Sequence, residues 1–392
     1  MAHFYPMPSL LNHSNHWPDF APHGMTQESL TLSSLKLLEH CPKDTPLQLL
    51  TSGRDGPTIL MLGARWSLEG YRDHWHFFDG EQSQTFPREK GDFAASLDLI
   101  QQQWITRQPE PFKAGIFLSY EAGWDQEHPR KALKENDTCP ELILFCPREI
   151  ILSDSEKTTS YRNRGEASLL CSTPENDPQQ QHFARDVRLK NDEPKETYLN
   201  KAKKITEQIR EGNSFQVNLS QSFSSSHLPH FRHWANHALK TQSASFAGVL
   251  QWKNFDLLSL SPERLLKLES SEKLITRPIA GTLPRKHSKD GLLDLSLEKQ
   301  NLKRFKQSPK ELAEHNMLID LERNDLGKVS EIGSVLVEEY LTIETLPHVH
   351  HLVSQVIGQK RPELGPGTTL FATFPGGTIT GCPKLETMHI LN

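Results

Sequence analysis

A glycine-rich segment near the end of the chain has the composition of an anion-binding loop. Residues 374–384 read Phe-Pro-Gly-Gly-Thr-Ile-Thr-Gly-Cys-Pro-Lys, with three glycines, two threonines and one lysine. Glycines let a backbone curl tightly, so that N–H groups and threonine hydroxyls can face a bound anion. The segment is not a Walker A motif, because Cys382 follows Gly381 where that motif has lysine.

A carboxylate, Glu314, lies on the apolar face of a helix predicted over residues 309–325. Burying an unpaired charge costs on the order of several kcal/mol, so this group needs a cation or a proton. Two interpretations stay open. Glu314 pairs with Arg323 or Lys310, or it binds Mg²⁺, which takes few protein carboxylates and fills its shell with substrate oxygens and water. The predicted face contains Glu314, Met317, Leu318, Leu321 and Asp325.

Two further segments carry groups that could do chemistry. Residues 276–285 place Ala280 and Gly281 between two arginines and two prolines, which permits close approach of a ligand, although an ordinary turn fits equally well. Residues 348–351 contain three histidines. In a strand His350 and His351 would point to opposite faces, so one neutral histidine acting in proton transfer is more plausible than a zinc site. Structural packing is the default for both.

Composition sets limits on the kind of protein. The 392 residues suit two domains or one large layered domain. A net charge of −5, with both signs scattered, argues against nucleic-acid binding. The five cysteines show no CxxC spacing, and the sequence has neither an apolar run long enough for a membrane span nor a signal peptide at its start. We expect a soluble cytoplasmic protein that uses neither nucleic acid nor a membrane.

The elements that must position these residues form an α+β pattern. The helix over 309–325 has Ser308 as N-cap, Pro309 at its first position and Glu311 completing a capping box. Another helix is expected from Tyr198 to Gly212, with an apolar stripe on one face. Strands are expected over 58–62, 114–120, 142–145, 215–219, 247–252 and 257–260. These elements predict an N-terminal region, 1–170, a linker, 171–197, and a catalytic region, 198–392.

Taken together, the segments resemble the chorismate-utilising enzymes, namely anthranilate synthase component I and aminodeoxychorismate synthase component I. The blocks that carry the resemblance follow one another in register. The N-terminal part matches more loosely, through Leu49-Leu50-Thr51-Ser52 and Phe117-Leu118-Ser119-Tyr120-Glu121. The six matching blocks are residues 212–221, 261–264, 277–282, 313–327, 351–354 and 375–384.

The resemblance implies a layered α/β sandwich with its active site between two central sheets. It implies that Glu314 binds Mg²⁺, that His351 lies near the ring carbon that loses hydroxyl, and that Thr378 contacts substrate in a loop closed by Lys384. Gly281, Thr282, Gly377 and Lys384 complete the predicted substrate-binding residues. Mg²⁺ would clamp the chorismate carboxylate as a Lewis acid, and a histidine would protonate the departing hydroxyl. Ammonia would come from a glutamine amidotransferase (glutaminase) subunit.

The residues point to two branches of the family. Three features resemble aminodeoxychorismate synthase, which makes the precursor of 4-aminobenzoate and folate. They are Asn218, Thr51 in place of a glutamate, and the Ser119-Tyr120-Glu121 turn. Ala280 stands where those synthases typically carry a nucleophilic lysine, and it resembles anthranilate synthase, in which ammonia attacks directly. We favour aminodeoxychorismate synthase, with anthranilate synthase as the alternative and isochorismate or salicylate synthase less favoured.

Family members continue beyond the point that matches Asn392, through a segment with further Mg²⁺-binding glutamates. We therefore expect that the C-terminal part is missing from this sequence and that the chain as given is inactive or poorly folded. A truncated, non-catalytic chorismate-binding remnant is the remaining alternative.

Overall fold

The chain folds into two compact units in a computed structural model. The structure describes residues 25–30, 34–52, 57–89, 91–103, 114–124, 139–172, 188–226, 230–242, 244–285 and 293–392. The first unit contains the described residues of Met1–Arg188, Ser225–Pro262 and Pro366–Thr368. The second unit contains Leu189–Ser224, those described in Glu263–Gly365, and Thr369–Asn392.

This grouping differs from the consecutive regions predicted from the sequence. Residues 225–262 were assigned to the catalytic region, but their strand β14 (Phe246–Trp252) pairs along its length with β2 (Leu47–Thr51) of the first unit. Backbone pairing to a distant strand leaves little signal in a local pattern, so the assignment followed sequence order. Most of the predicted linker, residues 173–187, lies outside the described residues.

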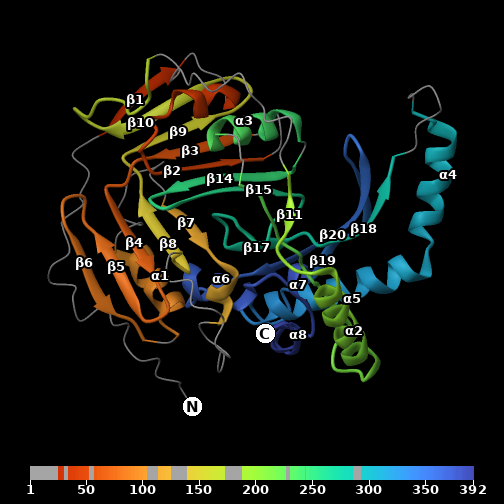
Figure 1. Cartoon of the computed structure of the whole chain (residues 1–392). Coiled ribbons are helices and arrows are strands. Elements are labelled where there is room, and N and C mark those ends of the chain that lie inside the picture. Colours follow the sequence, from red (N-terminus) through yellow and green to blue (C-terminus); the bar gives the residue numbers. More distant parts are fainter. Residues whose placement is uncertain are drawn as a thin grey trace. The chain divides into compact units, whose positions relative to one another are not determined.

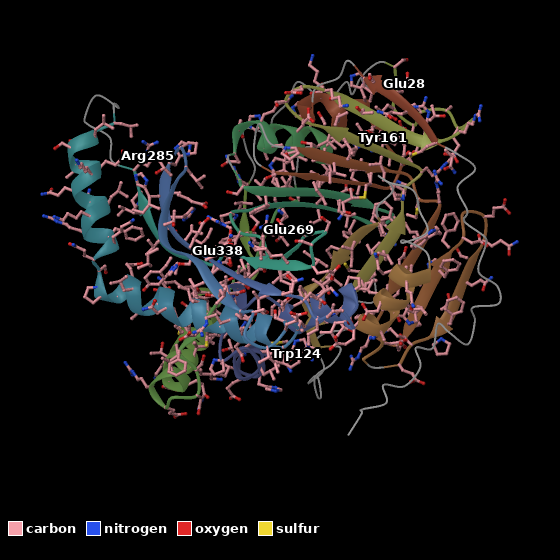
Figure 2. The ribbon with its side chains drawn as sticks, turned by 180° about the vertical axis from the view of Figure 1, so that it is seen from behind. Glu28, Trp124, Tyr161, Glu269, Arg285 and Glu338 are labelled. Carbon is pink, nitrogen blue, oxygen red and sulfur yellow. The ribbon has the colours of Figure 1, made fainter. Side chains whose placement is uncertain are left out.

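A seven-stranded antiparallel sheet forms one layer of the first unit (Figure 1). Leu47 and Leu49 of β2 point to one face of the sheet and are buried, whereas Leu50, on the other face, is exposed. At one edge, Glu28 pairs with Arg162 at 2.6 Å across two neighbouring strands (Figure 2). The strand order is β1 (Met25–Leu30), β10 (Thr158–Asn163), β9 (Glu149–Ser153), β3 (Thr58–Leu62), β2, β14 and β15 (Phe255–Ser261).

A second sheet of five strands packs against the first through an apolar layer. Met61, Ile150 and Leu250 from the larger sheet meet Ile143 and Phe145 from the smaller one. Burial of these side chains is the main force that joins the layers. The strand order is β6 (Ser83–Pro87), β5 (His74–Phe78), β4 (Trp66–Gly70), β8 (Leu142–Cys146) and β7 (Gly115–Leu118), and the helices of this unit include α1 (Asp92–Gln103) and α3 (Phe231–Thr241).

The carboxylate of Glu69, buried between these layers, is hydrogen-bonded and ion-paired by neighbouring side chains. Glu69 of β4 accepts hydrogen bonds from Trp252 Nε1 at 2.9 Å and from the Tyr71 hydroxyl at 3.0 Å. Lys253 Nζ lies 2.5 Å from the same carboxylate. These donors compensate the loss of hydration, so Glu69 links the two layers.

The second unit is built on a five-stranded sheet crossed by one long helix (Figure 1). The sheet order is β16 (Lys267–Leu268), β17 (Lys273–Thr276), β20 (Val349–Gln359) and β18 (Ile279–Pro284), with β19 (Leu336–Thr345) also paired to β20. Helix α5 (Pro309–Gly327) packs on β18 and β20. The other helices are α2 (Lys195–Arg210), α4 (Leu295–Lys306), α7 (Gly377–Thr380) and α8 (Lys384–Leu391), and α6 (Pro366–Thr373) belongs to this unit from Thr369 on.

Short two-stranded pairings complete the second unit. β11 (Lys190–Asn191) pairs with β13 (Phe223–Ser224), and β12 (Gln216–Val217) pairs with β21 (Gly381–Cys382). The predicted strand over 215–219 is therefore only two residues long, because its partner is the glycine-rich segment. No helix among the described residues is long and apolar enough to cross a membrane.

Several local predictions are confirmed. The strand predicted over 58–62 is β3, and the predicted helix starting at Ser308 is α5. The Ser308 hydroxyl accepts from the Glu311 N–H at 3.4 Å. The capping box is only half formed, because the N–H of Ser308 donates to the Phe305 carbonyl. Predicted apolar periodicity gave α2 correctly, although it starts three residues earlier, at Lys195.

Candidate active site

Helix α5 provides one wall of the candidate site in the second unit. Its start is fixed by Ser308 and Pro309, whose N-cap hydroxyl and preset φ angle favour the first turn. The predicted face is partly right: Leu318, Leu321 and Asp325 are buried, whereas Glu314 and Met317 are only half-buried. The buried side chains of α5 are His315, Leu318, Ile319, Leu321, Glu322, Asp325 and Leu326.

Glu314, the predicted Mg²⁺ ligand, does not belong to a preformed metal cage among the described residues. Its carboxylate forms no hydrogen bond or ion pair with another described residue, and Arg323 pairs instead with Asp320 at 2.9 Å. Within the described ranges, no three His, Cys, Asp or Glu side chains are grouped as for a metal ion. Mg²⁺ often uses one or two protein carboxylates with substrate oxygens and water. Glu314 is compatible with that role, and Mg²⁺ binding stays a prediction.

Strands β18 and β20 bring two of the predicted residues together. Thr282 Oγ1 lies 3.0 Å from His351 Nδ1 across the pairing of these strands. The pairing slips between Ile279 and Thr282, where Gly281 has φ +88°. Burial lowers the pKa of His351, although a backbone contact from Gly281 acts in the opposite sense. The imidazole is therefore neutral at pH 7 and oriented by a hydroxyl.

The other histidines of the run have different surroundings. His350 points away from His351, with its Nε2 3.0 Å from Glu298 Oε1 and its Nδ1 2.9 Å from Thr345 Oγ1. Arg285, at the end of β18, also contacts Glu298, at 2.9 Å (Figure 2). The opposite orientations follow from the strand geometry predicted for residues 350 and 351.

The glycine-rich segment folds into the short helix α7 and strand β21. The Thr378 hydroxyl donates to Glu263 Oε1 at 3.0 Å. The side-chain amide of Asn218 donates to the Thr378 carbonyl at 2.6 Å. Gly377 lies against Leu321 of α5 so closely that a Cβ there would be 2.1 Å from Leu321 Cδ2. The loop is therefore held by residues from three separate segments of the chain.

We expect Gly381→Ala to unfold the glycine-rich loop locally. Gly381 has φ +137°, and an added Cβ would lie 2.1 Å from the Gln216 carbonyl oxygen. Both effects oppose the β12–β21 pairing, so the expected cost is about 2–4 kcal/mol in the free energy of unfolding. Urea unfolding measures this cost. Gly212→Ala is the matched control, because Gly212 also has positive φ but no atom lies within 4 Å of its added Cβ.

Lys384 closes the loop through a buried ion pair. Its Nζ lies 2.5 Å from Asp325 Oδ2 and donates to the Thr373 carbonyl at 2.7 Å. Both charged side chains are buried. Lys384 was predicted to bind substrate, but in this arrangement its ammonium is directed to α5 and to the end of α6. Its observed contacts are those of a residue that anchors the loop.

Ala280 lies in an apolar cluster. It is 3% exposed and packs with Leu318 and Leu321, with Met317 and Cys382 at the margin. The cluster leaves its short side chain without a polar partner.

Two acidic residues of the site were not predicted from the sequence. Glu263 was part of a matching block but was given no role, and burial raises its pKa to about 7. Burial also raises the pKa of Glu322 to about 7. Both raised pKa values result from burial by segments that are distant in the sequence. The local sequence pattern therefore gave little indication of them.

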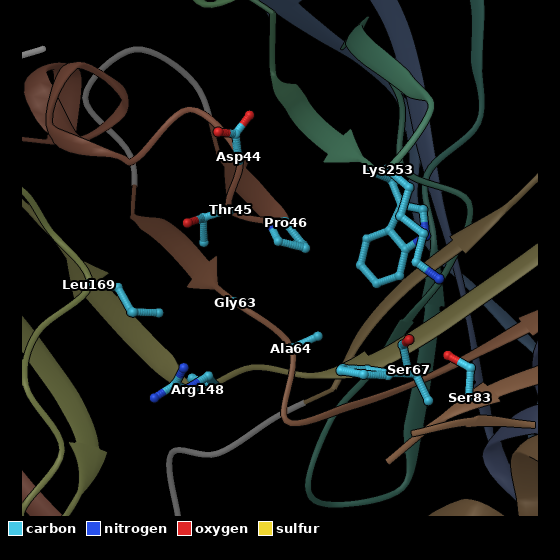
Figure 3. A pocket seen from close by; sticks show the side chains of 12 residues that line it. Asp44, Thr45, Pro46, Gly63, Ala64, Ser67, Ser83, Arg148, Leu169 and Lys253 are labelled. Carbon is cyan, nitrogen blue, oxygen red and sulfur yellow. The ribbon is translucent and has the colours of Figure 1, made fainter. Parts of the chain in front are cut away.

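A cavity of about 440 Å³ lies elsewhere, within the first unit (Figure 3). It is lined by apolar groups that include Trp252, with Arg148 and Lys253 among its charged residues. None of the predicted site residues lines it. The chemistry predicted from the sequence is therefore concentrated in the second unit.

The second unit thus carries Glu263, hydrogen-bonded to the glycine-rich loop, and a neutral His351 imidazole on the paired strands β18 and β20. A carboxyl and an imidazole of this kind can transfer protons, as in enzymes that use general acid–base catalysis. The chain belongs to the chorismate binding enzyme family, whose sequence profile matches residues 49–392. That match confirms the family predicted from the sequence.

The similar proteins include members of both predicted branches. Anthranilate synthase component 1 1 of Haloarcula marismortui is 30% identical over 84% of this chain and 73% of its own length. Aminodeoxychorismate synthase component 1 of Escherichia coli is 38% identical over 50% of this chain, and the alignment spans 42% of that relative. Anthranilate synthase component I from Streptococcus pneumoniae shares the fold, with a TM-score of 0.66 at 23% identity, covering 86% of this chain and 76% of that one.

Proposed function

We propose that this chain aminates chorismate to 4-amino-4-deoxychorismate, using ammonia from a glutamine amidotransferase subunit. The observation that carries this proposal is the contact between Asn218 and the Thr378 carbonyl, at 2.6 Å. Asn218 is the residue of the matching blocks that resembles aminodeoxychorismate synthase, and here it positions the loop expected to meet substrate. The Escherichia coli relative bears the name of that synthase.

The proposed proton donor is Glu263. With a pKa raised to about 7 by burial, this carboxyl keeps its proton up to about pH 7. A protonated carboxyl can donate to the ring hydroxyl of chorismate, which then leaves as water. The Thr378 hydroxyl orients the carboxyl through a 3.0 Å hydrogen bond. The sequence predicts this step for His351, but burial lowers the pKa of His351, so little imidazolium is present at pH 7 to give a proton.

His351 and the loop have supporting roles in this proposal. The neutral imidazole, fixed by Thr282 at 3.0 Å, can hold the departing oxygen or the incoming amine by a hydrogen bond. Gly281 and Gly377 let the backbone approach a ligand closely. Mg²⁺ held in part by Glu314 would supply Lewis-acid stabilisation of the chorismate carboxylate. With Ala280 in place of lysine, ammonia is the direct nucleophile.

Anthranilate synthase is the second candidate, and Ala280 favours it. The alanine is packed among Leu318 and Leu321, so no protein amine forms a covalent intermediate there. The Haloarcula marismortui relative, which aligns with 84% of this chain, also carries the name anthranilate synthase component 1.

Product identification separates the two candidates. The chain is incubated with chorismate, Mg²⁺ and excess ammonium in mildly alkaline buffer, and the products are resolved by mass and fluorescence. We expect non-fluorescent 4-amino-4-deoxychorismate, which an added lyase converts to 4-aminobenzoate. Fluorescent anthranilate with release of pyruvate would replace the proposal by the second candidate. Omitting chorismate and omitting ammonium are the controls.

A further inference from the structure

Glu322 is a buried acid of the site for which the proposed reaction has no use. It is 6% exposed, and it lies on the buried face of α5 one turn before Asp325. Its Oε2 accepts one hydrogen bond, from the Thr276 hydroxyl at 2.7 Å. An ionised carboxylate can accept about four hydrogen bonds, so a single hydroxyl poorly compensates the loss of water. The environment therefore favours the protonated form of Glu322.

Lys384 and Lys328 form no ion pair with Glu322, because their ammonium groups pair with Asp325. Lys384 Nζ is 2.5 Å from Asp325 Oδ2, and Lys328 Nζ is 2.8 Å from Asp325 Oδ1. Among the described residues, no lysine or arginine forms an ion pair with Glu322. Burial is the largest cause of its raised pKa; the negative charge of Asp325 adds to it, and Thr276 and Lys384 oppose it.

Glu322 and Glu263 are attached to the same short connection between strands. Thr276, the last residue of β17, donates to Glu322. Ile279, the first residue of β18, donates its backbone N–H to Glu263. Residues 276–279 thus hold both carboxyls, and the charge of Glu322 raises the pKa of Glu263. Two acids so placed titrate as a pair, because the ionisation of one disfavours that of the other.

We propose that Glu322, held by Thr276, is a positioning residue that keeps a proton on Glu263, so that the two carboxyls carry at most one negative charge when chorismate binds. The inference rests on the proposed function. In the reaction, Glu263 gives its proton to the departing hydroxyl, water leaves, and Glu263 becomes a carboxylate. Glu263 is then reprotonated from solvent before the next turnover.

Several charged groups surround the pair and set its behaviour. Asp325 opposes ionisation of Glu322 from the next turn of α5, and Lys384 of α8 favours it. The hydroxyls of Thr276 and Thr378 stabilise the ionised forms of Glu322 and Glu263, respectively. Because none of these groups neutralises both carboxyls, the proton balance of the site depends on the pair itself.

Infrared difference spectroscopy of the full chain tests the coupling without requiring turnover. The carbonyl band of protonated carboxyls is titrated between about pH 5 and 9 in the parent, Glu322→Gln and Glu263→Gln. We expect two protons to titrate near neutrality in the parent. In Glu322→Gln, the remaining Glu263 midpoint should fall by about one pH unit. Glu269→Gln, at a carboxylate paired with Lys267 at 2.6 Å on the surface, should leave both midpoints unchanged.

The pH profile of kcat then connects the pair to catalysis. Glu322→Gln should move the alkaline limb of kcat to lower pH by the same amount, with KM for chorismate nearly unchanged. A Glu263 midpoint that stays in place in Glu322→Gln, or a parent protein without protonated carboxyls near neutrality, would overturn the inference. If Glu322→Gln does not fold, the titration of the parent still tests the inference, because the inference requires carboxyls that are protonated near neutrality. If coupling is seen but no amine product forms, only the proposed function fails.

Discussion

Glu263→Gln is expected to reduce kcat for chorismate amination by about 10²–10⁴-fold, the range for loss of a general acid. The amide keeps the size of the side chain and can still accept from Thr378, but it has no proton to give. KM should change little, because the hydrogen-bonding position is retained. The measurement is kcat and KM for the amine product with saturating ammonium.

The pH dependence follows from the raised pKa of Glu263. The protonated acid is the active form, so the activity of the parent should fall as pH rises through about 7. The assay holds the concentration of unprotonated ammonia constant at each pH, so that the nucleophile does not shape the profile. The residual activity of Glu263→Gln should lose this alkaline limb.

Stability measurements separate lost catalysis from lost folding. The pKa of Glu263 is higher in the folded protein, at about 7, than the usual 4.5. The folded state therefore binds more protons between these values, and the stability of the parent declines as pH rises through that window. Glu263→Gln removes the share of this decline that comes from Glu263 and should be at least as stable as the parent above pH 7. Glu269→Gln, on the β16–β17 turn, is the matched variant and should retain activity (Figure 2). If Glu263→Gln retains nearly the kcat of the parent, another group acts as the acid, and His351 is the first candidate.

Asp325→Ala is expected to lower the free energy of unfolding by about 3–5 kcal/mol, because it leaves the Lys384 ammonium buried without its counter-charge. Asp325 is 2% exposed and Lys384 is 8% exposed. The pair joins α5 to the start of α8, and Lys384 also holds the Thr373 carbonyl at 2.7 Å. The glycine-rich loop should therefore lose its fixed conformation, and chorismate binding should weaken. Urea unfolding and a binding titration measure the two effects.

Asp320→Ala provides the control on the same helix. Asp320 pairs with Arg323 at 2.9 Å, but both side chains are largely exposed, so the expected cost is under about 1 kcal/mol. The double variant Asp325→Ala, Lys384→Met should recover part of the loss, because no charge is then left buried. If Asp325→Ala and Asp320→Ala cost the same, the buried pair is not what holds the loop.

The sequence alone determined the family and most of the local structure. Ser308 and Pro309 specify the start of α5 through backbone capping, and apolar runs specify β3 and β14, because these signals act over a few residues. The ordered blocks, including the 313–327 block and the glycine-rich loop, identified the chorismate binding enzymes. The glycine-rich segment, which was expected to curl tightly, contains the short helix α7 and the strand β21.

Only the tertiary structure decided which carboxyl can hold a proton. Glu263, Glu322 and Asp325 are ordinary acids in a local pattern, yet burial separates them: two have raised pKa values, and the third is paired with two lysines. The tertiary structure also shows that Lys384, a predicted ligand of substrate, contacts Asp325 and the Thr373 carbonyl and anchors the loop. It places residues 225–262, predicted as part of the catalytic region, in the first unit. Desolvation and ion pairing depend on neighbours brought from distant segments, and these are set by packing rather than by spacing along the chain.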